Sequence, residues 1–115
     1  MKKIIAIDDD PVLLSFYEAV FSDDATGFPT VEEALDFLAD TEACVVVLDF
    51  YIPNSKGTID EHIKKLIEYA PVIVRSGVVD ARVGESCINA GASHYFFKNG
   101  DHQKFIRTVL SYCKE

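Results

Sequence analysis

Short apolar runs alternate with longer amphipathic segments along the chain. Each run stops abruptly at a polar residue, and the four clearest are Ile4–Ile7, Val45–Leu48, Val72–Val74 and Tyr95–Phe97. Uninterrupted apolar strands of this kind are buried on both faces, as in parallel sheets. The runs therefore predict four parallel strands. A fifth strand at 25–28 is expected to be a short edge strand or to be absent, because Gly27 and Pro29 disfavour a longer one.

The segments between these runs carry helical patterns. Asp10 before Pro11 is typical of an N-cap with proline in the first turn, and Thr30 with Glu33 forms a capping box. Apolar stripes at helical spacing predict helices after both caps and in the later segments 59–70, 80–90 and 105–113. This alternation predicts an α/β fold with a doubly wound parallel sheet.

A polar residue able to do chemistry stands at the end of every predicted strand. Asp8 and Asp9 end the first run, Asp49 the second, Ser76 the third and Lys98 the fourth. Ligands bind at the carboxyl ends of the strands in such sheets, so we expect these side chains to share a pocket. Carboxylates about 4 Å apart repel by about 4 kcal/mol per pair, which calls for a cation. Oxygen ligands favour Mg²⁺, Mn²⁺ or Ca²⁺, and the whole set is suited to holding a phosphoryl group.

Most of these residues also have an ordinary structural explanation. The acidic run Asp8–Asp10 suits a helix N-terminus, and Asp10 is expected to serve mainly as the cap. Ser76 stands before a glycine, as in many turns, and Lys98 suits an exposed loop. Asp49 is harder to explain, because burying a carboxylate at the end of an apolar strand is costly.

Composition and charge narrow the classes of function. The 115 residues are 49% apolar, which suits one domain over residues 1–115. A formal charge of −8 argues against nucleic acid or an anionic membrane surface as a partner. The run Ile4–Ile7 is too short for a signal peptide, so a cytoplasmic protein is expected. Cys44, Cys87 and Cys113 have no metal-like spacing and are expected to be free thiols.

Four segments carry a family resemblance when they are taken together. They are Ile5–Pro11, Val46–Pro53, Val72–Gly77 and Ala90–Lys98. Their acidic opening, the proline four residues after Asp49 and the 22-residue interval from Ser76 to Lys98 resemble response-regulator receiver domains, close to the chemotaxis-regulator type. The resemblance covers nearly the whole chain. It implies a flavodoxin-like five-stranded sheet in the order 2-1-3-4-5, with helices on both faces.

The resemblance also implies roles for the acidic residues. Asp49 would be the phosphoacceptor of a two-component system or phosphorelay. Asp9 would bind Mg²⁺, or Mn²⁺, directly, and Asp8 mainly through water. Asp49 itself and the backbone carbonyl of Tyr51 would complete the protein ligands of the metal.

The remaining implied roles concern the phosphoryl group and the signal. Ser76 would donate a hydrogen bond to that group and Lys98 would pair with it, while Ser76 and Tyr95 would act as the switch. The implied partners are a histidine kinase or phosphotransfer protein and a downstream effector protein, and the chain would not be a conventional enzyme. One departure from the family is Asn99, which replaces the usual proline and leaves the isomer of the preceding peptide bond open.

Two other functions fit part of the pattern. Asp8-x-Asp10 after an apolar strand resembles haloacid-dehalogenase-like phosphatases, in which Asp8 would be the nucleophile and Asp10 the general acid. Ser76, Lys98 and Asp101 could serve as the later motifs, but Asp49 would have no role. A degenerate, unphosphorylated binding module on the receiver scaffold is the third possibility.

Overall fold

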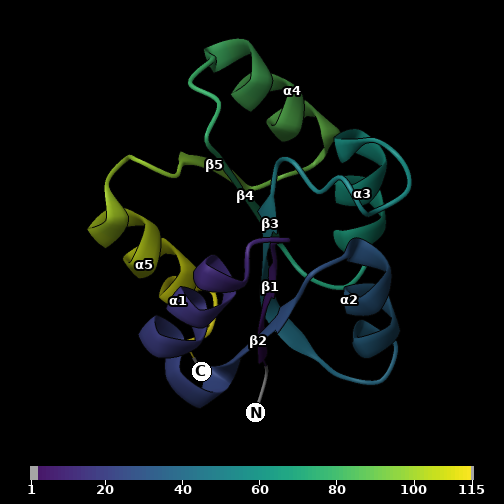
Figure 1. Ribbon diagram of the computed structural model, residues 1–115, viewed down its shortest axis with the longest axis vertical. Helices are drawn as coiled ribbons and strands as arrows, with labels where there is room; N and C mark the ends of the chain where they lie inside the picture. The colour runs from purple at the N-terminus through teal and green to yellow at the C-terminus, as the bar shows by residue number, and fades with distance from the viewer. Residues whose placement is uncertain (1–2, 115) are drawn as a thin grey trace.

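Five parallel strands form one sheet in the order β2-β1-β3-β4-β5, flanked by helices (Figure 1). The computed structural model describes residues 3–114. Its elements are β1 (Lys3–Ile7), α1 (Pro11–Phe21), a 3₁₀ turn (Ser22–Asp24), β2 (Ala25–Phe28), α2 (Val31–Leu38), β3 (Ala43–Asp49), α3 (Ile59–Leu66), β4 (Val72–Ser76), α4 (Ala81–Ala90), β5 (His94–Phe97) and α5 (His102–Ser111). The predicted fold class and strand order are confirmed, and β2 is the expected short edge strand.

Two apolar layers lie on opposite faces of the sheet because successive strand residues point to opposite sides. Ile5 and Ile7 of β1 pack toward α2, α3 and α4, whereas Ile4 and Ala6 pack toward α1 and α5 (Figure 1). The central strand β3 is buried along its whole length. The same alternation sends Arg75 of β4 into the layer of α1 and α5.

The helix starts follow the predicted caps. The carboxylate of Asp10 accepts a hydrogen bond from Val12 N at 2.9 Å, and Thr30 Oγ1 accepts one from Glu33 N at 3.2 Å. The helix predicted over 59–70 is shorter than expected, since α3 ends at Leu66 and a turn leads to Pro71. No peptide bond within residues 3–114 is cis, which includes the bond between Lys98 and Asn99.

The expectation that all three cysteines are free thiols is wrong. Cys44 at the start of β3 forms a disulfide with Cys113, just beyond α5, although 69 positions separate them in sequence. The fold brings these two segments together on one face of the sheet, and sequence spacing alone does not reveal this. Cys87 is a free, buried thiol on α4.

None of the helices within residues 3–114 is both long and apolar enough to cross a membrane.

Candidate functional site

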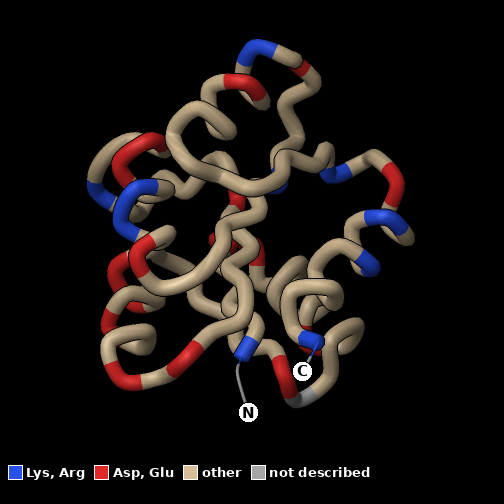
Figure 2. Tube along the Cα trace, turned by 180° about the vertical axis from the view of Figure 1, so that it is seen from behind, with Lys and Arg blue, Asp and Glu red and all other residues tan. Residues whose placement is uncertain are grey.

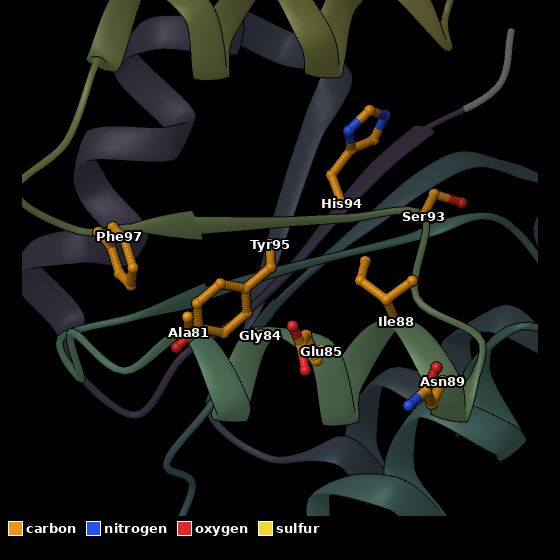
Figure 3. Close-up of a pocket in the computed structure, with 9 residues that line it drawn as sticks. All are labelled: Ala81, Gly84, Glu85, Ile88, Asn89, Ser93, His94, Tyr95 and Phe97. Carbon is orange, nitrogen blue, oxygen red and sulfur yellow. The ribbon is translucent and has the colours of Figure 1, made fainter.

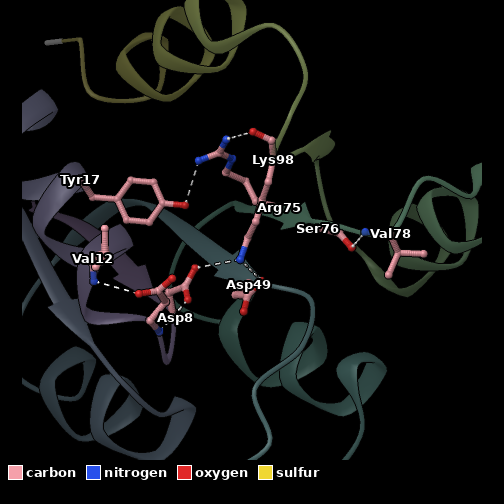
Figure 4. A network of polar contacts seen from close by, with 9 residues as sticks. Asp8, Val12, Tyr17, Asp49, Arg75, Ser76, Val78 and Lys98 are labelled. Atoms are coloured by element: carbon pink, nitrogen blue, oxygen red, sulfur yellow. Dashed lines mark hydrogen bonds and ion pairs between the residues drawn. The ribbon is translucent and has the colours of Figure 1, made fainter.

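The carboxyl ends of β1, β3, β4 and β5 meet at one edge of the sheet, where they form a pocket of about 440 Å³ (Figure 4). All five side chains that sequence analysis placed at strand ends line it: Asp8, Asp9, Asp49, Ser76 and Lys98. Asp8, Asp49 and Ser76 are buried, while Asp9 is exposed. The predicted convergence of these residues therefore occurs.

Lys98 joins two carboxylates across the pocket. Its Nζ lies 2.9 Å from Asp49 Oδ1 and 3.3 Å from Asp8 Oδ2. Asp8 Oδ1 accepts a hydrogen bond from the backbone N–H of Asp10 at 2.9 Å. Asp8 Oδ2 is buried and has no hydrogen bond of good geometry, so the 3.3 Å ion pair with Lys98 is its main compensation. A buried carboxylate oxygen in this state is costly unless a further positive group approaches it.

The pKa values of these groups reflect burial opposed by the ion pairs. Burial raises the pKa of Asp8 and that of Asp49 above the usual carboxyl value, against the opposite effect of Lys98. Burial by itself would lower the pKa of Lys98, but hydrogen bonding and charge from Asp49 and Asp8 together raise it. The single ammonium group therefore compensates two buried carboxylates incompletely.

A divalent cation fits the remaining negative charge. Asp8, Asp9 and Asp49 each offer a carboxylate oxygen, and these oxygens lie within 4.8 Å of one another. Figure 2 shows acidic residues at the strand ends in the centre of the molecule as well as along α2, whereas α5 carries basic residues. An all-oxygen set with one unpartnered oxygen suits Mg²⁺. That the backbone carbonyl of Tyr51 is a further metal ligand stays a prediction. The Tyr51 side chain lies at the rim of the pocket and is 67% exposed.

Ser76 is connected to the following loop. Its Oγ accepts a hydrogen bond from Val78 N at 2.9 Å, so the hydroxyl proton remains available for a ligand. Tyr95 OH donates to the carbonyl of the same Val78 at 3.0 Å. The Tyr95 ring lies over α4 at Gly84, beside a second pocket of about 560 Å³ between α4 and β5 (Figure 3).

Arg75 is a polar residue of this region that sequence reasoning missed. It is 2% exposed, and its guanidinium donates to the carbonyl of Lys98 at 3.2 Å (Figure 4). The sequence did contain a sign of this residue, because the charged Arg75 stands between the apolar run Val72–Val74 and Ser76.

The fold and site define a doubly wound α/β domain with an acidic, lysine-bridged pocket at the carboxyl edge of its sheet. A family model described as the response regulator receiver domain matches residues 4–110. The chain belongs to this family of signalling phosphoacceptor domains, which are not enzymes in the conventional sense and which interact with histidine kinases. No curated protein matches the chain significantly in sequence.

Solved structures share the fold at low sequence identity. The chain is similar to the beryllofluoride-activated DrrB receiver domain, with 24% identity, a TM-score of 0.84, and coverage of 100% of this chain and 99% of that one. It is also similar to a CheY-like receiver domain protein from Methanospirillum hungatei JF-1 (19% identity, TM-score 0.81, coverage 96% and 92%). A third similar structure is the beryllofluoride-activated receiver domain of Klebsiella pneumoniae RstA, with 18% identity, a TM-score of 0.85, and coverage of 99% of this chain and 100% of that one.

The phosphatase alternative loses its support from the same observations. The family match covers the second half of the chain as well as the motif at Asp8. The carboxylates that this alternative needs beside Asp8 are helix caps: Asp10 accepts from Val12 N, and Asp101 accepts from Lys104 N at 3.0 Å.

Proposed function

We propose that Asp49 accepts a phosphoryl group from a phosphohistidine on a histidine kinase or phosphotransfer protein. The observation that carries this proposal is the contact between Lys98 Nζ and the buried Asp49 Oδ1 at 2.9 Å, in a pocket that holds two further carboxylates. An ammonium group beside the acceptor oxygen stands ready to stabilise the charge of an incoming phosphoryl group.

In the proposed transfer, a carboxylate oxygen of Asp49 attacks phosphorus in line with the leaving group. The P–N bond of the phosphohistidine breaks, and its electron pair stays on the imidazole nitrogen. Lys98 then pairs with a phosphoryl oxygen, and Ser76 donates its hydroxyl proton to another. The hydrogen bond from Val78 N supports this role, because it fixes Ser76 Oγ while leaving its proton free.

Asp8, Asp9 and Asp49 would hold Mg²⁺ or Mn²⁺, with the Tyr51 carbonyl as a further ligand. The bound metal would supply positive charge to the phosphoryl oxygens during transfer. The buried Asp8 Oδ2 supports this assignment, because its ion pair with Lys98 leaves it without a hydrogen bond of good geometry.

The proposed output is a change in the surface around α4 and β5 that a separate effector protein reads, with the cytoplasm as the setting. The main chain of Val78 supports this coupling, because it is bonded at its two ends to Ser76 and to Tyr95. A phosphoryl group that draws Ser76 toward itself would disturb both bonds and shift the position of Tyr95.

The test is to locate the covalent bond. The protein is incubated with Mg²⁺ and acetyl phosphate, the acyl phosphate is trapped chemically, and the labelled peptide is mapped. We expect the label on Asp49, its loss in Asp49→Asn, and no repeated turnover of small phosphomonoesters. Label on Asp8 would favour phosphatase chemistry, and no label anywhere would favour an unphosphorylated binding module.

A further inference from the structure

Arg75 is a cation in the apolar layer between the sheet and helices α1 and α5. Its side chain is 2% exposed and is surrounded by Tyr17 and by Phe105, both of which are buried. A charged group is expensive to bury unless other groups compensate it. None of the ion pairs within residues 3–114 involves Arg75, so no carboxylate neutralises it directly.

The partners of Arg75 are neutral, and they come from three different elements. Nη1 donates to Tyr17 OH of α1 at 3.1 Å, and the guanidinium lies 4.2 Å from the ring centre of Phe105 on α5. Nη2 donates to the carbonyl of Lys98 at 3.2 Å (Figure 4). Nε has no hydrogen-bond partner. Aromatic faces and the tyrosine hydroxyl thus hold the guanidinium in place while one branch points at Lys98.

Lys98 stands where the main chain needs such support. It follows the last residue of β5 and precedes Asn99 and Gly100, which are exposed and lack the ring that fixes φ in proline. Its N–H donates to the Ser76 carbonyl at 2.8 Å, which is the last contact of this strand pair. The bond from Arg75 holds the other side of the same residue. The main chain of Lys98 is therefore bonded on both sides before its side chain extends to Asp49 and Asp8.

We propose that Arg75 is a positioning residue, which sets the main chain of Lys98 so that Nζ reaches the acceptor carboxylate. This inference rests on the proposed phosphoacceptor function. Arg75 itself touches neither carboxylate in an ion pair, and it acts through Lys98 alone. Arginine suits this position because its planar guanidinium can stack on Phe105 while it donates to Tyr17 and to Lys98. The ammonium group of a lysine is not planar and could not do this.

A double-mutant cycle separates positioning from a purely structural role. Phosphorylation by acetyl phosphate at saturating Mg²⁺ is followed by mass spectrometry in the wild type, Arg75→Met, Lys98→Met and the double variant. Misplacement of a reacting group by about 1 Å can cost roughly 100-fold, so we expect Arg75→Met to slow phosphorylation by roughly 10- to 100-fold. We expect the double variant to be no slower than Lys98→Met, because the two residues act as one unit.

Two further variants keep the test decisive. Tyr17→Phe removes the hydroxyl that holds Nη1 while leaving the layer filled, and it should cause a smaller loss that again vanishes in combination with Lys98→Met. This variant carries the test if Arg75→Met does not fold. Val109→Ala is the matched control, since the apolar Val109 side chain is buried in the same layer. It should lower stability without changing the phosphorylation rate.

The possible outcomes distinguish this inference from the proposed function. The positioning role would be overturned if the rate losses of Arg75→Met and Lys98→Met multiplied in the double variant. It would also be overturned if folded Arg75→Met were phosphorylated at the wild-type rate. Either result would leave the role of Asp49 intact. If Lys98→Met were phosphorylated normally, the proposed chemistry of Lys98 and the inference about Arg75 would fail together. Magnesium affinity is the independent readout, and weaker binding in Arg75→Met would indicate general damage to the pocket and refute positioning.

Discussion

Ser76 and Tyr95 are joined through a single residue, since Val78 donates its N–H to the Ser76 hydroxyl and accepts the Tyr95 hydroxyl at its carbonyl. The first bond measures 2.9 Å and the second 3.0 Å. A displacement of either hydroxyl group therefore acts on the same peptide segment between β4 and α4. This connection is a direct physical route from the acidic pocket to the surface of α4 and β5.

The Val78 connection predicts that Tyr95→Phe loosens the loop after β4. A hydrogen bond of this kind contributes about 0.5–1.5 kcal/mol, so amide exchange at Val78 and Val79 should become roughly 2- to 10-fold faster. Tyr112→Phe is the matched control, because the Tyr112 hydroxyl bonds to His94 Nε2 at 2.9 Å and does not contact this loop. Equal exchange rates in the two variants would disprove the coupling through Val78.

Magnesium should raise the stability of the wild-type protein. A ligand that binds only the folded state at ten times its Kd adds about 1.4 kcal/mol to the free energy of unfolding. Asp9→Asn should reduce this gain, whereas Asp36→Asn, which removes the same charge from the exposed face of α2, should not. The measurement is thermal unfolding with EDTA and with millimolar MgCl₂. An unchanged Tm in the wild type would show that the three carboxylates hold no metal.

The disulfide predicts that stability depends on reducing agents. Linking Cys44 to Cys113 closes a long loop, and such links contribute about 2–4 kcal/mol to the free energy of unfolding. Urea denaturation should therefore show a lower midpoint after treatment with dithiothreitol. Cys113→Ser should match the reduced wild type and should no longer respond to dithiothreitol. A wild-type midpoint that is the same in both conditions would argue that the bond is absent in solution.

The buried thiol of Cys87 should make the folded protein less stable at high pH. Burial, assisted by the charge of Asp60, raises the pKa of the Cys87 thiol from 9.0 to about 11. The folded state thus keeps a proton that the unfolded chain loses above about pH 9, so this contribution to stability is complete below pH 9 and declines as the pH approaches 11. The free energies of unfolding of wild type and Cys87→Ala should be compared from pH 7 to 11. Their difference should fall only above pH 9, and parallel curves would contradict the shifted pKa.

The acidic site was predictable from sequence because strand ends are a local signal. Asp8, Asp49 and Lys98 each follow an apolar run, and parallel pairing necessarily brings such positions to one edge. Contacts between helices and the sheet carry no comparable signal. The pairing of Cys44 with Cys113 depends on how α5 docks on the sheet, which periodicity does not specify. The contact of Arg75 with Lys98 depends on the path of the main chain just after β5, which periodicity does not specify either.

The rim of the pocket predicts a long-lived phosphoryl group on Asp49. Tyr51 and Val78 both line the pocket, and their side chains are 67% and 43% exposed. Each is uncharged and apolar over most of its surface, so together they narrow the approach of water and provide no carboxylate or amide to orient it.

The double variant Tyr51→Asn with Val78→Glu should shorten this lifetime, because it places an amide and a carboxylate where water must approach. The Val78 substitution leaves the main-chain bonds to Ser76 and Tyr95 available, so the geometry of the loop is retained. The protein is phosphorylated with acetyl phosphate, the donor is removed, and loss of the label is followed in Mg²⁺ buffer. Val79→Glu serves as the control, because Val79 is exposed on the same loop but does not line the pocket. A lifetime in the double variant equal to or longer than that of the wild type would show that the rim does not limit hydrolysis.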